Sequence, residues 1–365
     1  MGELVGIYDG VHQTPDYQDS GIMFLSVENI ATLKSEKYIS EAAFERDYKV
    51  YPEKGDILMT RIGDVGTTNV VETAEKVAFY VSLALLKPNG IDSYFLSNAM
   101  KTNPFLKGLR ERTLVTAIPQ KINKDEIGKI DIFITNNDEE QKKIGAYFHN
   151  LDHLITLHQR KCDEIKTLKK YMLQKMFPEK GKLVPEIRFD GFTEDWEQRK
   201  VSELCSISTG KSNTQDKSEY GEYPFYVRSP IIERSTKYLY DEEAVITVGD
   251  GVGTGKVFHY VNGKYDLHQR CYRMYGFSDE LNAHYFYHTF SKLFYKRVMA
   301  MTAKTSVDSV RLEMIADMEI PTPTIEEQIK IGTYFDNLDH LITLHQHKCE
   351  ELQKLKKFML QNMFV

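Results

Sequence analysis

EEQKKIGAYFHNLDHLITLHQRKCDEIKTLKKYMLQKMF at residues 139–177 returns as EEQIKIGTYFDNLDHLITLHQHKCEELQKLKKFMLQNMF at residues 326–364. The offset is 187 residues, and 29 of the 39 aligned positions are identical. This period differs from that of a solenoid, whose repeats run to about 20–50 residues. We therefore interpret the chain as two similar halves related by a pseudo-two-fold axis. Such a protein, with two reading heads, suits a ligand that carries two sites in tandem, and DNA is the usual ligand of this kind.

Each copy of the repeat has the apolar spacing of a long helix. Apolar residues recur at intervals of 3, 4 and 7, as in a coiled-coil seam, and continue through Leu168 to Met172 in the first copy and through Leu355 to Met359 in the second. A helix of about 38 residues is roughly 57 Å long. Because neither helix is expected to leave such a stripe in water, the sequence predicts that the two pack against each other, antiparallel. The predicted seam comprises Phe148, Leu151, Ile155, His158, Cys162 and Ile165 in the first helix and Phe335, Leu338, Ile342, His345, Cys349 and Leu352 in the second.

A block of short strand-like runs and turns precedes each helix. The two blocks match at Gly63–Thr67 and Gly249–Thr254. The sequence therefore predicts an α+β protein in which two similar head domains are joined by two long antiparallel coiled-coil helices. The runs that read as strands are 22–30, 55–63 and 77–87 in the first block and 223–230, 242–260 and 267–277 in the second, with helical patches at 92–110 and 282–300. The predicted domains are a first head at 1–138, a central helix and linker at 139–184, a second head at 185–325 and a C-terminal helix at 326–365.

The bulk composition is that of a soluble globular protein, with 41% hydrophobic and 27% charged residues. No apolar run approaches the ~20 residues of a membrane span, and the first residues do not resemble a signal peptide. The cysteines form no CxxC pair, which indicates a reduced, cytoplasmic protein with neither a disulfide framework nor a zinc site. They are Cys162, Cys205, Cys271 and Cys349.

The net charge of −6 does not favour nucleic-acid binding, because a stand-alone, non-specific DNA-binding protein is normally basic. If this protein binds DNA, its positive surface must be local, or a partner must supply much of the phosphate contact.

The helix repeats follow head domains and are introduced by a proline-containing turn and Glu-Gln, as in Ile320–Gln328. Together with the run Tyr334–Ile342, its twin at 147–155, and LVPEIRFDGFTEDWEQRK at 183–200, this arrangement resembles the specificity subunit of type I restriction–modification systems. The stretch 183–200 is similar to the segment that opens target-recognition domains in this family. The resemblance covers nearly the whole chain, and it rests on the combination of architecture and motifs.

The resemblance implies a non-catalytic subunit that reads a bipartite DNA target, one half-site per head. The helix pair would set the length of the unspecified spacer and dock two methyltransferase subunits, and two restriction–translocase subunits would join for cleavage. Catalysis, S-adenosylmethionine, ATP and Mg would belong to these partners, with no cofactor or metal bound by this chain. Phosphate contacts made by the partners would also explain the negative net charge.

The chain departs from the family pattern at its first head. Both heads of the family are preceded by the opening segment, whereas here Glu3-Leu4 aligns with Glu203-Leu204, and the first head begins without it. We expect this departure to affect the stability of the first head or one of its partner contacts.

Three motifs invite a catalytic interpretation, and the sequence does not favour any of them. The segment Gly249–Lys256 would need Gly at 250 and Ser or Thr at 257 to form a phosphate-binding loop, but those residues are Asp and Val. A glycine-rich turn between strands is the alternative. Asn103-Pro104-Phe105 lacks the second proline of the tetrad expected for methyl transfer to a base amino group. Pro15-Asp16 with Asp47 and Lys49 imitates a nuclease site at the level of chance.

Histidines on the long helices do not form a metal site by spacing. His153 and His158 lie five residues apart, whereas ligands on one helix face need three or four. His149 and His153 have that spacing, but the twin of His149 is Asp336. We expect His158 to be a polar seam residue that fixes the register of the helix pair.

Basic and polar residues in the head loops are the candidates for reading DNA, because Arg pairs with guanine and Asn or Gln with adenine by bidentate geometry. Each is also a candidate for a phosphate contact or for ordinary solvated surface. The candidates are His12, Gln13, Thr14, Arg61, Asn69 and Arg112 in the first head and Lys211, Asn213, Arg228, Lys256, His268, Arg270 and Lys304 in the second.

Overall fold

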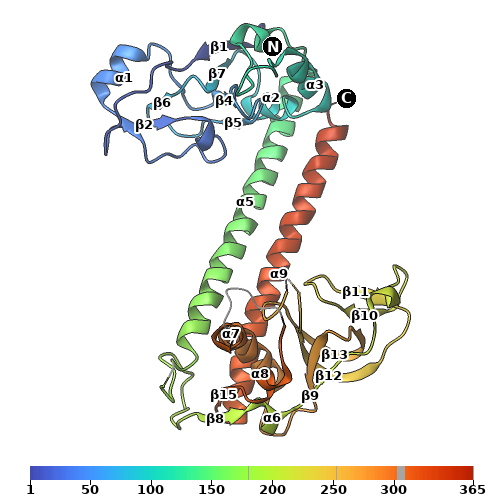
Figure 1. Ribbon diagram of the computed structural model, residues 1–365. Coiled ribbons are helices and arrows are strands. Elements are labelled where there is room, and N and C mark those ends of the chain that lie inside the picture. The colour runs from blue at the N-terminus through green and yellow to red at the C-terminus, as the bar shows by residue number, and fades with distance from the viewer. Residues whose placement is uncertain (180, 252, 302–308, 365) are drawn as a thin grey trace. The chain divides into compact units, whose positions relative to one another are not determined.

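The computed structural model describes residues 1–179, 181–251, 253–301 and 309–364 (Figure 1). The chain forms two compact units. Unit 1 comprises Met1–Gln159 and Gln346–Val365, and unit 2 comprises Arg160–His345. Each unit therefore contains one head together with part of both long helices.

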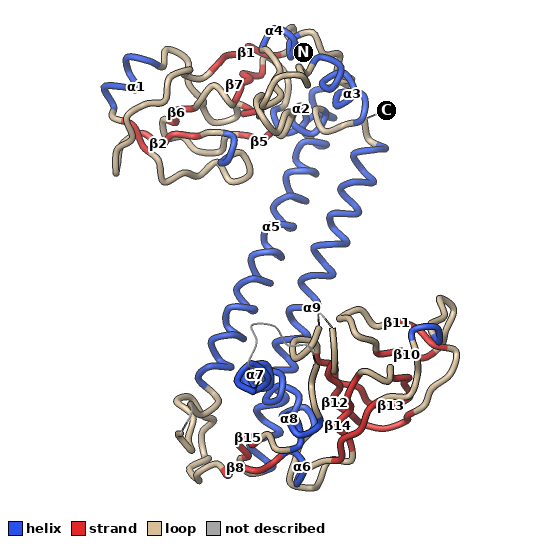
Figure 2. Tube along the Cα trace, viewed as in Figure 1, coloured by secondary structure: helices blue, strands red, loops and turns tan. Residues whose placement is uncertain are grey.

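The two repeats form the long helices α5 (Asp138–Lys175) and α9 (Ile325–Asn362), each of 38 residues, which Figure 2 shows as uninterrupted tubes. In unit 1 the early residue Phe148 of α5 shares a buried cluster with the late residue Leu352 of α9. In unit 2 the order is reversed, since Cys162 Sγ lies 3.9 Å from the carbonyl oxygen of Ile342. Low-numbered residues of one helix thus face high-numbered residues of the other in both units, so the helices pack antiparallel.

The seam residues divide into buried and half-buried positions. Phe148, Leu151 and Cys162 on α5 are buried, and the counterparts Phe335, Leu338 and Cys349 on α9 are buried as well, as is Leu352. Ile155, His158, Ile165, Ile342 and His345 are half-buried. The continuation of the stripe to Leu168 and Leu355 is corrected, because these side chains are 43% and 41% exposed. Met172 and Met359, the last residues of the predicted stripe, are partly buried against the hydrophobic clusters of unit 2 and unit 1, respectively.

Head one contains two small sheets. The first has the strand order β1-β7-β4-β5 and the second β3-β2-β6, with β6 parallel to β2 and the other pairs antiparallel. The strands are β1 (Val5–Asp9), β2 (Ile22–Leu25), β3 (Tyr38–Ile39), β4 (Ile57–Thr60), β5 (Thr68–Val70), β6 (Val77–Phe79) and β7 (Leu83–Pro88). The helices are α1 (Glu41–Asp47), α2 (Ser93–Ala99), α3 (Asn103–Arg112) and α4 (Lys124–Gly128), with a 3-10 turn at Val27–Asn29.

Head two contains one six-stranded sheet of order β11-β10-β13-β12-β14-β9 and a separate pair, β15-β8. The strands are β8 (Glu197–Lys200), β9 (Ser206–Thr209), β10 (Tyr223–Tyr226), β11 (Glu233–Ser235), β12 (Tyr240–Val248), β13 (Phe258–Leu267), β14 (Cys271–Tyr275) and β15 (Glu319–Thr322). The helices are α6 (Val201–Leu204), α7 (Ala283–Met301) and α8 (Leu312–Ala316), with a 3-10 turn at Thr214–Asp216.

The two heads share one strand order. The long strand β13 pairs with β12 along its first part and runs parallel to β10 at its end. In head one, two shorter strands divide this role, since β5 pairs with β4 and β6 runs parallel to β2. If β5 and β6 are counted as one strand, head one has the order β1-β7-β4-β5/β6-β2-β3. This order matches β9-β14-β12-β13-β10-β11 in head two, so the edge strands β1 and β9 correspond.

Each long helix is joined to its head by a glutamine at the equivalent position of the repeat. Gln141 Oε1 accepts from the backbone N–H of Asp92 at 3.2 Å, and its Nε2 donates to the carbonyl of Thr135 at 2.7 Å. Gln328 repeats both bonds, with the N–H of Asn282 at 3.0 Å and the carbonyl of Pro323 at 2.8 Å. The side-chain oxygens of Asp92 and Asn282 accept backbone N–H bonds from the first turns of α2 and α7, the helices that follow them in the heads. The glutamine of the Glu-Gln motif therefore ties each long helix to the start of a helix in its head.

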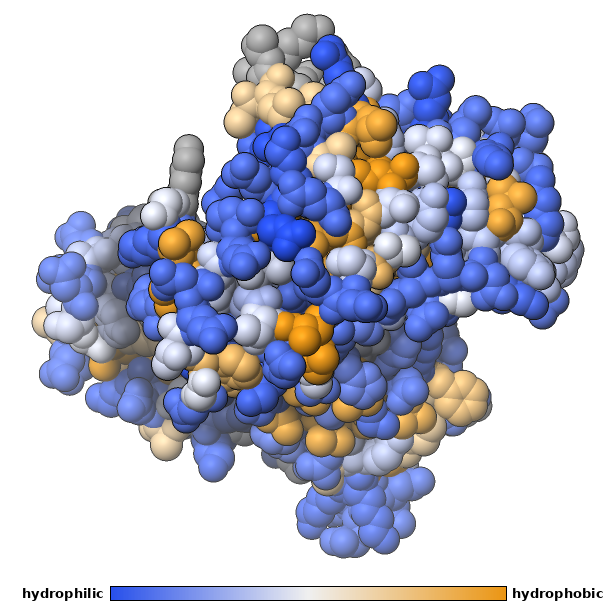
Figure 3. Space-filling view, turned by 90° about the horizontal axis from the view of Figure 1, so that it is seen from below, coloured by the Kyte–Doolittle hydropathy of each residue, from blue (hydrophilic) through white to orange (hydrophobic). Residues whose placement is uncertain are grey.

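The face of the molecule that Figure 3 shows is mostly hydrophilic. In the view of Figure 3, apolar side chains reach the surface in small groups among polar and charged ones. Within the described ranges, every helix is too short or too polar to cross a membrane.

Candidate nucleic-acid interface

Four loops of head two meet at one end of its sheet. Ser212 forms a bridge with His268, and the N–H of Gly249 donates to the carbonyl of Arg270 at 2.8 Å. Gly210 permits this close approach, because a Cβ there would lie 2.2 Å from the carbonyl oxygen of Leu267. The loops are 210–216 after β9, 227–232 after β10, the described residues 249–251 and 253–257 after β12, and 268–270 between β13 and β14.

Two exposed arginines in these loops share one carboxylate. Arg228 Nη1 lies 3.3 Å from one oxygen of Asp250, and Arg270 Nε lies 3.7 Å from the other. Their side chains remain 48% and 63% exposed, whereas that of Asp250 is 21% exposed. Asp250 thus holds two guanidinium groups near each other at the surface, an arrangement that suits bidentate recognition of guanine or contact with phosphate.

His268 has a structural role in this cluster. Its ring is buried, Nδ1 accepts from the N–H of Arg270 at 3.1 Å, and Nε2 lies 3.3 Å from Thr214 Oγ1. Burial lowers the pKa of His268, and the neighbouring Arg228 lowers it further. Both ring nitrogens contact groups within the loops and shape the turn that carries Arg270, and contact of His268 with DNA stays a prediction.

The other candidates of head two lie at different places. Lys211 is exposed and Asn213 is half-buried in the loop after β9, beside the arginine pair. Lys256 is exposed, with its ammonium 5.1 Å from the ring centre of Tyr295 on α7. Lys304 lies outside the described residues.

Head one presents the corresponding loop after β1. A Cβ at Gly10 would lie 2.4 Å from the carbonyl of Phe79, as at Gly210 in head two. His12, Gln13 and Thr14 follow it and are exposed, and their contact with DNA stays a prediction. Arg112 ends α3 half-buried, with Nη1 3.4 Å from the carbonyl of Gly108.

Arg61 and Asn69 make contacts inside head one, and their contact with DNA stays a prediction. The side chain of Arg61 is 8% exposed and forms an ion pair with Asp9, so its charge is used inside head one. The amide of Asn69 donates to the carbonyls of Ile30 and Ala31 at 3.0 and 3.2 Å, and its oxygen accepts from the N–H of Val70. Both side chains hold strands and loops together.

Sequence reasoning missed Asp250 and Gln269 as members of the cluster. Gln269 is exposed between His268 and Arg270, and its amide lies 2.5 Å from the side-chain oxygen of Asn213. The adjacent polar residues could have drawn attention to Gln269, whereas the role of Asp250 depends on contacts across loops. Within the described part of the chain, no group of three or more His, Cys, Asp or Glu side chains is placed to hold a metal ion.

A family model described as the type I restriction modification DNA specificity domain matches residues 14–167 and 193–354. The type I restriction enzyme MjaVIII specificity subunit of Methanocaldococcus jannaschii is 23% identical over 275 residues, 68% of this chain and 64% of the relative. The EcoDI specificity subunit of Escherichia coli is 24% identical over 165 residues, 45% of this chain and 36% of the relative. The alignments thus span less than two thirds of these relatives.

Among solved structures, the S subunit of a type I restriction–modification system from M. genitalium has a similar fold. Its TM-score is 0.75 at 14% sequence identity, and the match covers 100% of this chain and 94% of that one. This likeness confirms the predicted fold, in which two similar heads are joined by long helices.

Proposed function

The chain belongs to the family of type I restriction–modification DNA specificity subunits, and we propose from this premise that each of its heads reads one half of a bipartite DNA target. The observation that carries the proposal is the combination of a shared frame with different loops. Both heads have the same strand order and the same glutamine joint, but in the matched glycine-containing turn Asp250 of head two contacts Arg228 and Arg270, whereas Asp64 of head one accepts a bond from Thr67. A common frame with different loops suits the reading of two different sequences.

The arginine pair of head two supports direct reading of base edges. Guanidinium groups recognise guanine O6 and N7 in a fork geometry, and a carboxylate between them fixes their direction before DNA arrives. The same arrangement would also hold phosphate. The carboxylate keeps the net charge of this surface low, in line with a chain whose total charge is −6.

We also propose that the long helices dock two methyltransferase subunits and set the spacer between the half-sites. A second apolar stripe, separate from the seam, supports docking, because all its members are at least 39% exposed and it occurs at equivalent positions of both helices. Its residues are Leu154, Leu157, Leu168 and Tyr171 on α5 and Leu341, Leu344, Leu355 and Phe358 on α9. In this proposal two restriction–translocase subunits complete the complex, and S-adenosylmethionine, ATP and Mg bind to the partners.

Selection from randomised duplexes tests the proposal. The chain is purified with its methyltransferase partner, and bound duplexes are sequenced. We expect two short conserved blocks separated by a spacer of fixed length. Absence of any enriched sequence would favour the alternative in which the heads bind proteins and the chain is a scaffold. Methylation or cleavage by the isolated chain would contradict the non-catalytic role and favour a DNA enzyme.

A further inference from the structure

Unit 1 contains a cavity of about 770 Å³ between head one and the long helices. Its volume lies within the range of small-molecule sites, about 300–1,000 Å³. Head one contributes the loop 30–34, residues of the segment 67–73 and one side of α2, while α5 and α9 supply the remaining wall. Most of the lining side chains are polar or charged, so the cavity suits a polar ligand.

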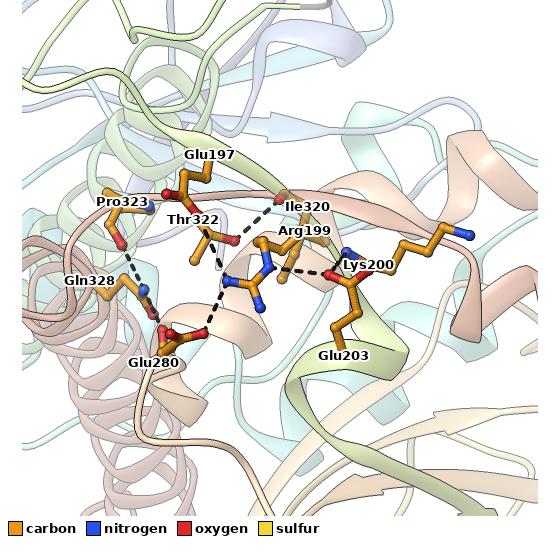
Figure 4. A network of polar contacts seen from close by, with 9 residues as sticks. All are labelled: Glu197, Arg199, Lys200, Glu203, Glu280, Ile320, Thr322, Pro323 and Gln328. Atoms are coloured by element: carbon orange, nitrogen blue, oxygen red, sulfur yellow. Dashed lines mark hydrogen bonds and ion pairs between the residues drawn. The ribbon is translucent and has the colours of Figure 1, made fainter.

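In unit 2, residues 183–200 cover one face of the first turn of α9. Arg188 Nε lies 2.7 Å from a carboxylate oxygen of Glu327, whose side chain is fully buried. The segment ends in β8, where Arg199 Nη1 lies 3.0 Å from a carboxylate oxygen of Glu280 (Figure 4). The face of α9 that carries Glu327 is therefore occupied by this segment.

The cavity of unit 1 lies on the opposite face of its own long helix. Glu140 of α5 is the counterpart of Glu327, and His149 follows it after nine residues, or about two and a half turns. His149 lines the cavity together with Asp152. The cavity therefore does not correspond to the face that residues 183–200 cover in unit 2, and it requires an explanation of its own.

Two lysines of the cavity lie beside one carboxylate. Lys356 Nζ is 2.5 Å from Asp152 Oδ1, so this carboxylate is already bonded. Burial, together with the charge of Lys356, lowers the pKa of Lys101 to about 8, whereas Asp152 acts in the opposite direction. At pH 7 the two ammonium groups exceed the charge of the carboxylate, and a lysine shifted by burial in a cavity is typical of binding sites. This part of the cavity favours an anion.

Asn98 presents a hydrogen-bond acceptor to the same cavity. The residue is 3% exposed, and its amide nitrogen donates to the carbonyl of Tyr94 at 2.8 Å. In the part of the chain that the structure describes, its side-chain oxygen has no hydrogen-bond partner. A buried acceptor without a donor destabilises the folded chain. A ligand with an N–H or O–H group would remove this deficit.

The matching position of unit 2 is satisfied by the chain itself. His288 of α7 and Asn98 of α2 each lie six residues after the residue that caps the helix. His288 Nε2 is 2.8 Å from Asp336, the repeat counterpart of His149. In unit 1, His149 packs instead against the ring of Tyr94, with ring centres 4.2 Å apart. Unit 1 thus leaves open to the cavity a polar position that unit 2 pairs internally.

We propose that the cavity of unit 1 binds a small phosphorylated ligand of the nucleoside monophosphate class. Its phosphate binds between Lys101 and Lys356, because lysine is a common phosphate ligand and the anion offsets their excess positive charge. Its base donates an N–H to Asn98 and stacks on the ring of Tyr94. This class combines an anion, a donor and a flat ring in one molecule. The proposal does not depend on DNA recognition by the heads.

Isothermal titration calorimetry of the intact protein with AMP, in a phosphate-free buffer, tests this proposal. At pH 7 we expect one saturable site per chain. The affinity should fall about tenfold between pH 7 and pH 9, because Lys101 loses its proton there while the phosphate remains a dianion. Absence of saturable binding up to about 1 mM at pH 7 would overturn the proposal. Displacement of AMP by duplex DNA would assign the phosphate site to the DNA backbone, and would overturn it as well.

Two variants locate the bound ligand. Lys101→Met should weaken AMP binding at pH 7 at least about tenfold and remove the pH dependence, whereas Lys107→Met, at an exposed position of α3, should change neither. Asn98→Leu should weaken binding of AMP and leave that of inorganic phosphate unchanged, because inorganic phosphate has no base to reach the asparagine. The midpoint of thermal unfolding shows that each variant is folded. Unchanged affinity in Lys101→Met, or equal losses for both probes in Asn98→Leu, would overturn the assigned contacts.

Discussion

Lys169 of α5 and Asp339 of α9 form an ion pair in unit 2, with Nζ 2.6 Å from each carboxylate oxygen. Lys356 and Asp152, the residues at equivalent positions of the repeat, form the same pair in unit 1 at 2.5 Å. The two lysine side chains are 21% and 18% exposed. One interaction thus occurs once in each unit, with the roles of the two helices exchanged.

Reversing the charge of one partner should destabilise the protein, and reversing the other as well should restore its stability. Lys169→Glu places two carboxylates together and should lower the free energy of unfolding by about 1 kcal/mol, the upper end for a partly exposed pair. Asp339→Lys in the same chain should restore most of the loss. Chemical denaturation measures both variants, with Lys170→Glu, at an exposed neighbouring position, as the control for net charge. A double variant no more stable than Lys169→Glu alone would show that the pair contributes nothing.

Burying a charge in the seam should disrupt the helix pair. Leu151 and Leu338 are 5% and 7% exposed, so replacing both by Asp should lower the midpoint of thermal unfolding strongly or separate the helices, because an unpaired charge is costly to bury. Leu154→Asp with Leu341→Asp is the matched control three residues further along each helix, where the side chains are 40% and 39% exposed. Similar midpoints for the two double variants would contradict the assigned seam.

Arg270→Ala should change the sequence preference of one half-site. Loss of a bidentate contact with guanine costs about 1–3 kcal/mol at one base pair, and distant sites are usually additive. The motif methylated in cells by the chain and its methyltransferase partner measures the effect. Lys264→Ala removes the same charge from head two within β13, at a position outside the four converging loops, and should leave the motif unchanged. Altered preference in both half-sites would contradict independent heads.

Lengthening both long helices should lengthen the spacer. Four extra residues after Arg160 and after His347 add about 6 Å to each helix, while DNA rises about 3.4 Å per base pair. The methylated motif should therefore gain one or two spacer base pairs and keep both half-sites. The seam nearly returns to phase after four residues, whereas a two-residue insertion turns it away and should abolish activity. Full activity with an unchanged spacer would show that the partners fix the geometry.

Lys101 should make stability depend on pH in the alkaline range. Burial lowers its pKa to about 8 in the folded chain from an ordinary value of 10.5. The unfolded chain therefore holds more protons between these values, and stability rises as pH increases from 8 to 10.5. Lys101→Met should raise the free energy of unfolding at pH 7 by about 1–3 kcal/mol and reduce this rise. Lys107→Met, at an exposed position of α3, is the control, and destabilisation by Lys101→Met would contradict the assignment.

The long helices were predictable from sequence because their signal is local and occurs twice. The strand-like run 77–87 was less informative, since the structure divides it into β6 and β7, which belong to different sheets. Side-chain alternation does not reveal the break at residues 80–82, where Tyr80 N–H bonds to Leu25 and Val81 N–H bonds to Val11. These bonds depend on chain segments far away in sequence.

The candidate site was predictable only in part, for the same reason. The loop containing His268 and Arg270 was found from residue type, but type did not separate the buried imidazole from the exposed guanidinium beside it. Arg61 pairs with Asp9, a residue 52 positions away, and the two meet because β1 and β4 pair with opposite edges of β7. An isolated sequence shows which groups carry charge, whereas the fold determines which of them reach solvent.

The glutamine joints have a consequence for how such proteins diversify. Gln141 and Gln328 bond to main-chain atoms of their heads, so the joint makes few demands on the side chains of the head it holds. A gene that exchanged one head for another, or transposed the two, would keep both joints intact. Recombination within the nearly identical helix-coding stretches would then create new combinations of heads on the same pair of joints.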